Sequence, residues 1–139
     1  MKRNERGANL VEFAILAPLL ILLVFGIIEF AWVFAQNLNV RHGAREGARL
    51  AAVNFTPLVD ETCNRMDLVS GASVTILGTE INGASGFGPG DEVAITVDAP
   101  IQEITGLFTT LLPTNLDSTV SIRVEQPSTW TSGGPTACP

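Results

Sequence analysis

The chain has 139 residues, of which 46 % are hydrophobic and 16 % are charged, and its net charge is −6. Residues 1–7 hold three basic side chains and one acidic one, residues 8–54 hold three of each, and residues 55–139 hold two basic and ten acidic ones. The length suits one membrane helix and one small domain, and the acidic bulk lacks the basic footprint that nucleic-acid binding requires.

The first 35 residues combine a short basic leader with a long apolar run. Residues 1–7 form the leader, and the apolar residues continue, with few interruptions, to Ala35. An apolar stretch of about 18 residues or more is long enough to span a bilayer, so we predict a transmembrane part at about 13–35. Glu12 and Glu29 lie at the start and inside this run, and a carboxylate in lipid is costly enough to be a functional candidate.

The spacing at the start of the run resembles the cleavage site of type IV prepilins. Gly7 is followed by four residues and then by Glu12, which opens the apolar helix. The resemblance implies that a prepilin peptidase cuts between Gly7 and Ala8, which would make Glu12 the fifth mature residue. Two other interpretations stay open, namely a plain single-pass anchor and a secretory signal peptide with a mature start near Gln36.

The helical pattern continues past the apolar run. We expect one helix over residues 8–54, about 65–70 Å long at 1.5 Å per residue. Two rows of residues, each with a spacing of four, lie on opposite faces of this helix. The basic row consists of Arg41, Arg45 and Arg49, and the row of small residues consists of Gly43, Gly47 and Ala51. The small row predicts close helix packing, either as a seam between subunits or beneath the chain's own domain.

Residues 55–139 predict a small β-rich domain with an irregular tail after residue 127. Three segments have strand composition, at 72–77, 92–97 and 119–125, and the last two alternate apolar and polar residues. Residues 82–90 form a loop by composition, and we expect 107–112 to be a buried connection or a short helix. The whole chain is therefore predicted to be α+β, a long N-terminal transmembrane helix followed by a small antiparallel sheet.

The two cysteines, Cys63 and Cys138, both follow the apolar run. If that side of the membrane is extracytoplasmic, the simplest prediction is one disulfide between them; two independent thiols are the alternative. The bridge would tie the tail to the start of the domain.

No arrangement of residues in the sequence predicts catalysis, a cofactor or a metal. Two cysteines and a single histidine, His42, do not make a zinc site, and His42 is interpreted as a polar residue at the membrane interface. The acidic side chains of the domain are spread out, as on a solvated surface. We therefore expect a protein that is not an enzyme.

Several segments together resemble the TadE-like family of the tight-adherence (Flp) pilus system. The combination is specific, and it consists of Arg6-Gly7, Val11-Glu12-Phe13-Ala14, Pro18-Leu19-Leu20, Gly26-Ile27-Ile28-Glu29-Phe30 and Arg45-Glu46-Gly47-Ala48-Arg49. The resemblance implies a minor pilin or pseudopilin of this secretion-system-like pilus, acting in pilus assembly and surface adherence. The implied partners are the prepilin peptidase, the major and other minor pilins, the inner-membrane assembly machinery and the lipid bilayer.

The implied location is the bacterial cytoplasmic (inner) membrane, with the N-terminus inside and the C-terminal domain outside. Basic residues both precede and follow the apolar run, so charge alone does not set this orientation. Two other functions remain open, a membrane-anchored extracytoplasmic binding module and the main subunit of a related pilus. In this interpretation Glu12 and Glu29 are assembly residues, with Glu29 facing a neighbouring helix or a lipid headgroup.

Overall fold

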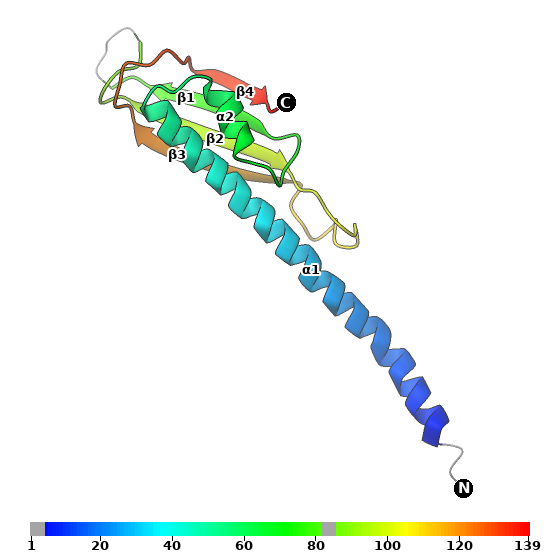
Figure 1. Ribbon diagram of the computed structural model, residues 1–139. Helices are drawn as coiled ribbons and strands as arrows, with labels where there is room; N and C mark the ends of the chain where they lie inside the picture. Colours follow the sequence, from blue (N-terminus) through cyan, green and yellow to red (C-terminus); the bar gives the residue numbers. More distant parts are fainter. Residues whose placement is uncertain (1–4, 82–85) are drawn as a thin grey trace.

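The computed structural model describes residues 5–81 and 86–139 and joins one long helix to a small domain (Figure 1). The described residues form two helices and four strands: α1 Glu5–Ala52, α2 Leu58–Asn64, β1 Ser73–Thr79, β2 Glu92–Pro100, β3 Asn115–Arg123 and β4 Gly133–Ala137. The predicted α+β class is therefore confirmed. Leader residues 1–4 and loop residues 82–85 lie outside the described residues.

Helix α1 is continuous through Pro18 and has 48 residues, which makes it about 72 Å long. It ends where Asn54 takes a left-handed conformation with φ of +55°, which asparagine tolerates better than most residues. The N–H of Phe55 then donates to the carbonyl of Leu50 and closes the last turn. The predicted long helix is thus present, and it starts and ends a few residues earlier than expected.

The sheet is antiparallel with the strand order β3-β2-β1-β4. The alternation in β2 places Val93, Ile95 and Val97 on the inner face, where each is fully buried. The inner face packs against the C-terminal half of α1, and α2 lies beside that half of the helix (Figure 1). The domain core is therefore built on the helix itself, as a limited core of this size requires.

Two local expectations were wrong, and one helix was missed. The tail contains β4, which pairs with β1, although residues 133–137 carry no alternation of apolar side chains. Residues 107–112 form turns and not a helix. They are not a buried connection either, because Leu107 and Leu111 are 64 % and 73 % exposed. Helix α2 was not predicted, since seven residues are too few to show a helical period.

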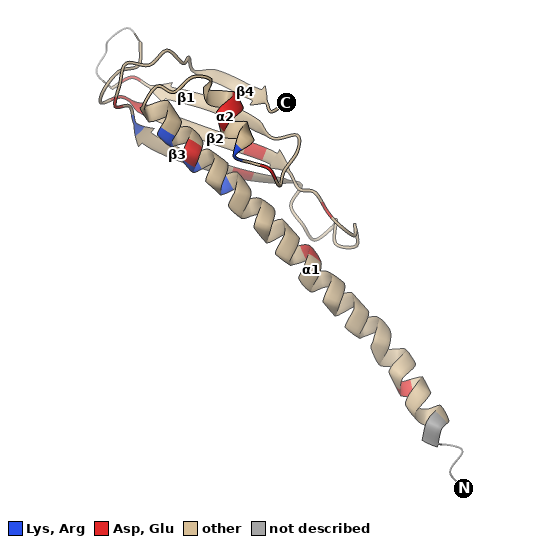
Figure 2. Cartoon of the chain, viewed as in Figure 1, with Lys and Arg blue, Asp and Glu red and all other residues tan. Residues whose placement is uncertain are grey.

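The domain covers only half of α1. Residues 7–28, which we call the bare segment, carry large apolar side chains that are almost all exposed. Residues 29–52, the covered segment, contact the domain along one face. Figure 2 shows that the bare segment of α1 is nearly devoid of charged residues, whereas the basic residues of this helix lie beside the sheet. Among the described residues, α1 is the helix that is long enough and apolar enough to cross a membrane.

Candidate functional site

The predicted cleavage site lies at the beginning of α1. Gly7 and Ala8 fall in its first turns and are exposed. A Cβ added to Gly7 would meet nothing within 4 Å outside the helix backbone around it. The first turn of a helix also has amide groups without helical partners. The bond between these residues is therefore accessible and belongs to the least stabilised part of the helix.

Glu12 is an exposed carboxylate inside the bare segment. Its neighbours Val11 and Phe13 are 62 % and 66 % exposed, so an apolar medium surrounds the carboxylate wherever this segment lies in lipid. No hydrogen bond or ion pair joins Glu12 to another of the described residues. A charge in that position is stabilised only by a partner from outside the described chain.

Glu29 has the opposite environment, because its side chain is fully buried. One carboxylate oxygen accepts the N–H of Ile104 at 2.9 Å. The other accepts the N–H of Thr105 at 2.9 Å and its hydroxyl at 2.7 Å. We expected Glu29 to face a neighbouring helix or a headgroup; instead its partner is the connection between β2 and β3 in the same chain. Its part in assembly stays a prediction.

One and two turns further along, Trp32 and Gln36 hold the same connection. The indole N–H of Trp32 donates to the carbonyl of Gln102 at 2.8 Å. The buried amide of Gln36 donates to that carbonyl at 2.8 Å and accepts the N–H of Gln102 at 2.9 Å. With Glu29, these side chains form what we call the latch, three polar groups of α1 that bind the backbone of residues 102–105. No sequence pattern predicted the latch, since its partners on the connection are mostly backbone groups.

The small row of α1 packs within the chain. A Cβ on Gly43 would lie 2.5 Å from the Met66 side chain, and a Cβ on Gly47 would lie 2.8 Å from Thr62 Oγ1. Ala51 is fully buried in the domain core. Of the two interpretations left open, packing beneath the chain's own domain is the one that the structure supports. This face is not free to form a seam with another subunit.

The basic row lies on the exposed face of the covered segment, as its spacing predicted. Arg41, Arg45 and Arg49 are all exposed, and so is His42. Arg49 forms an ion pair with Glu46 at 2.6 Å. Hydrogen bonding to Arg49 lowers the pKa of the Glu46 carboxyl below its ordinary value, and burial opposes part of this shift.

Cys63 and Cys138 form a disulfide with a Cα–Cα distance of 5.6 Å and a sequence separation of 75. The bridge joins α2 to the residue after β4, so it attaches the edge strand to the start of the domain. The predicted pairing is confirmed.

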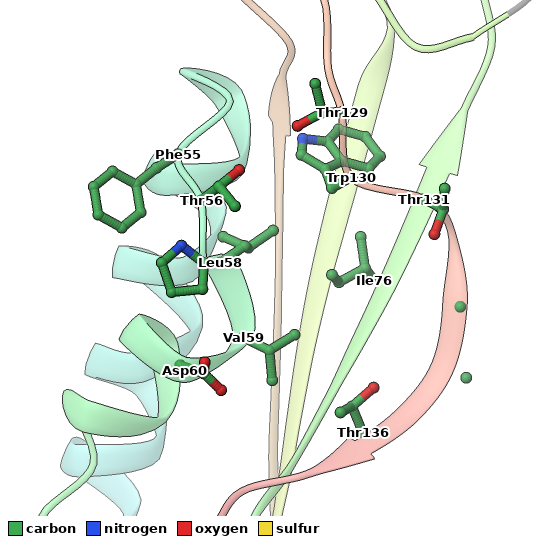
Figure 3. A pocket seen from close by; sticks show the side chains of 13 residues that line it. Phe55, Thr56, Leu58, Val59, Asp60, Ile76, Thr129, Trp130, Thr131 and Thr136 are labelled. Carbon is green, nitrogen blue, oxygen red and sulfur yellow. The ribbon is translucent and has the colours of Figure 1, made fainter.

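A cavity of about 380 Å³ opens beside α2 and β4 (Figure 3), and the residues that follow the C-terminal end of α1 form part of its lining. The indole N–H of Trp130 donates to the carbonyl of Ala51 at 2.9 Å, which fixes one wall. Threonines, glycines and apolar side chains form most of the lining, and Asp60 is the titratable residue among the described residues there. Within residues 5–81 and 86–139, no three His, Cys, Asp or Glu side chains gather in a way that could hold a metal. The cavity has the size of a small-molecule site but no pair of groups for acid–base chemistry.

The N-terminal helix is similar to a known protein family. Residues 7–49 match the family model described as TadE-like protein; this range includes the bare segment and most of the covered one. No curated protein and no solved structure matches the chain. The match confirms the resemblance of residues 7–49 to the TadE-like family, and it covers less than half of the chain.

Proposed function

We propose that this chain is a minor pilin or pseudopilin of a Tad-type pilus, a structural component rather than an enzyme. The observation that carries the proposal is Glu12, a carboxylate without a partner in the described chain, on a segment whose apolar side chains are bare. Such a segment needs both a lipid or protein environment and a cation from another molecule. The TadE-like match of residues 7–49 supports the assignment to this pilus system.

Cleavage between Gly7 and Ala8 by a prepilin peptidase would supply the cation. The new α-amine at Ala8 would be positive near neutral pH and would lie one helical turn before Glu12. In a bundle of such helices, the amine of one subunit can neutralise Glu12 of the next only in one axial register. Docking in that register would relieve both desolvated charges together, which favours ordered assembly over random association.

The disulfide supports an extracytoplasmic domain and an N-terminus on the cytoplasmic side. Disulfides persist in oxidising compartments and are rare in the cytosol, and Cys63 pairs with Cys138 here. The acidic domain would then project from the cytoplasmic membrane, where other pilins and the assembly machinery are its partners.

The first test is the N-terminal sequence of the mature protein recovered from membranes. The proposal expects a start at Ala8, and an intact N-terminus is the expectation for the alternative function of an anchored binding module. Gly7→Leu should leave an uncut precursor, because a bulky side chain obstructs the close backbone approach that glycine allows. A mature mass in that variant equal to that of wild type would contradict the proposed site.

The second test measures incorporation into pili at matched membrane levels. Glu12→Gln should insert normally and assemble poorly, since the amide keeps the shape and removes the charge. Glu46→Gln is the matched control, because it removes a half-buried carboxylate from the same helix outside the bare segment. Equal incorporation of Glu12→Gln and wild type would remove the assembly role and leave only a membrane anchor.

A further inference from the structure

Residues 101–112, between β2 and β3, form a loop that leaves the sheet and runs beside α1 toward the N-terminus (Figure 1). From Ile104 to Leu112 this loop contains no charged side chain. Ile104, Leu107 and Leu111 are 56 %, 64 % and 73 % exposed. Three large aliphatic side chains thus project from the uncharged stretch that follows Glu103, where an interaction site is expected.

The loop reaches the apolar part of α1. The ring of Phe108 lies 3.4 Å from the position of a Cβ on Gly26, and its centroid lies 6.1 Å from that of Phe30. Gly26 belongs to the bare segment, so the end of the loop is level with helix residues that are themselves apolar. Whatever medium surrounds α1 at Gly26 therefore also surrounds the side chains of the loop.

The latch limits how much of α1 can lie in hydrocarbon. A transmembrane part at 13–35 would place Glu29 and Trp32, and the loop residues bonded to them, inside the bilayer core. A transmembrane part at 8–28 has 21 residues and is about 32 Å long. This length matches a hydrocarbon core of about 30 Å. Gly26 and Phe30 then lie at the outer border of the core, and Trp32 lies in the interfacial zone that tryptophan favours.

The backbone of the loop is prepared for a medium with little water. Glu29 accepts the N–H groups of Ile104 and Thr105, and Thr105 Oγ1 accepts the N–H of Leu107. The carbonyl of Phe108 accepts the N–H groups of Leu111 and Leu112. Irregular backbone is tolerated at membrane depth only where its polar groups are satisfied, and these bonds meet much of that requirement.

We propose that the 101–112 loop is a second membrane contact, whose Ile104, Leu107 and Leu111 side chains insert into the interfacial region of the outer leaflet. The occupant is lipid because the uncharged stretch 104–112, which follows Glu103, continues the apolar surface of the bare segment through the contacts of Phe108 with Gly26 and Phe30. The latch then fixes the depth of α1 by attaching this contact at Glu29. The inference rests on membrane insertion of α1 in the proposed function and is independent of cleavage and pilus assembly.

The test uses the full chain with its disulfide intact, in vesicles of phosphatidylethanolamine and phosphatidylglycerol. Leu107→Cys is labelled with an environment-sensitive fluorophore, and quenching is compared between aqueous iodide and spin-labelled lipid. Because the Leu107 side chain is exposed, the fold should tolerate both the cysteine and its label at this position. We expect strong quenching by lipid with a shallow spin label, and most of the iodide quenching to be lost on reconstitution.

Two control positions make the outcomes distinct. A label at Thr131, which follows the Trp130 that bonds the C-terminal end of α1, should stay open to iodide. A label at Leu20, in the bare segment, should be quenched by deep spin labels. If Leu20 is protected while Leu107 is as open to iodide as Thr131, the lipid contact is wrong. Protection of Leu107 that arises only in assembled pili would also overturn it and would assign the loop to a neighbouring subunit. If Leu20 itself is open to iodide, membrane insertion fails, and the proposed function fails with it.

Discussion

The two halves of α1 have the same backbone and opposite partners. In the covered segment the small residues and the buried polar residues have partners in the chain. Gly47 lies against Thr62, and Glu29 accepts hydrogen bonds from the 101–112 loop. In the bare segment the side chains are large and aliphatic, and Glu12 has no partner among the described residues. In the covered segment, small and buried polar residues therefore mark contacts within the chain. In the bare segment, bulky apolar residues around an unpaired charge mark contacts that another molecule would have to make.

The largest expected effect comes from removing the disulfide of the domain that packs on the covered segment. Replacing Cys63 and Cys138 together with serine should lower the free energy of unfolding by about 4 kcal/mol, since a closed loop of this length strongly restricts the unfolded chain. The measurement is urea unfolding in detergent micelles, followed by tryptophan fluorescence. Membrane extraction of the variant should match wild type, because the bare segment is unchanged; an unaltered unfolding midpoint would contradict the stabilising role.

The next effect tests whether the small row belongs to the domain. Gly47→Leu would force a side chain against Thr62 and Ile95, which lie 2.8 Å and 3.2 Å from the added Cβ. Overpacking of this kind should destabilise the domain by about 3 kcal/mol, less the gain in helix propensity of roughly 0.5–1 kcal/mol. Ala14→Leu is the matched control in the bare segment, where the side chain is exposed. Equal stability of the two variants would show that the domain does not depend on this contact.

The sequence predicted the elements whose signals are local. The long helix follows from continuous apolar and alanine-rich composition, and β2 follows from the alternation of Val93, Ile95 and Val97. The disulfide could be predicted because only two cysteines exist. In α2, the acidic first turn with Asp60 was a signal that could have been used.

The parts that were missed depend on distant backbone groups. β4 is a Gly- and Pro-containing strand that exists because β1 offers it an edge and Cys138 attaches its end. The partner of Glu29 lies 75 residues away and is chiefly an amide N–H, which any residue could supply. The small row of α1 predicted a close approach correctly, but no property of the row itself specifies which element approaches.

The third prediction concerns the latch at the border between the two segments. Glu29→Gln replaces one acceptor oxygen by an NH₂ group, which cannot accept the N–H groups of Ile104 and Thr105 together. Amide hydrogen exchange at these two residues should accelerate by about tenfold or more, since hydrogen bonds to charged acceptors are among the stronger ones. Glu12→Gln is the control, because it leaves the loop untouched. Unchanged exchange in Glu29→Gln would show that the loop is held without this carboxylate.

The smallest effect concerns a pair on the exposed face of the covered segment. The pKa of Glu46 is lowered by its hydrogen bond to Arg49, so the folded state binds a proton at Glu46 less readily than the unfolded state does. Stability from this pair is therefore complete above the ordinary pKa of 4.5 and is lost as the pH falls through the lowered value. Because Arg49 is largely exposed, with 62 % of its side chain accessible, solvent and salt screen the pair and the loss should be barely measurable. Urea unfolding of wild type and Glu46→Gln, at neutral pH and near pH 3, isolates it: any difference seen at neutral pH should shrink in acid, and a difference that grows in acid would contradict the assigned direction.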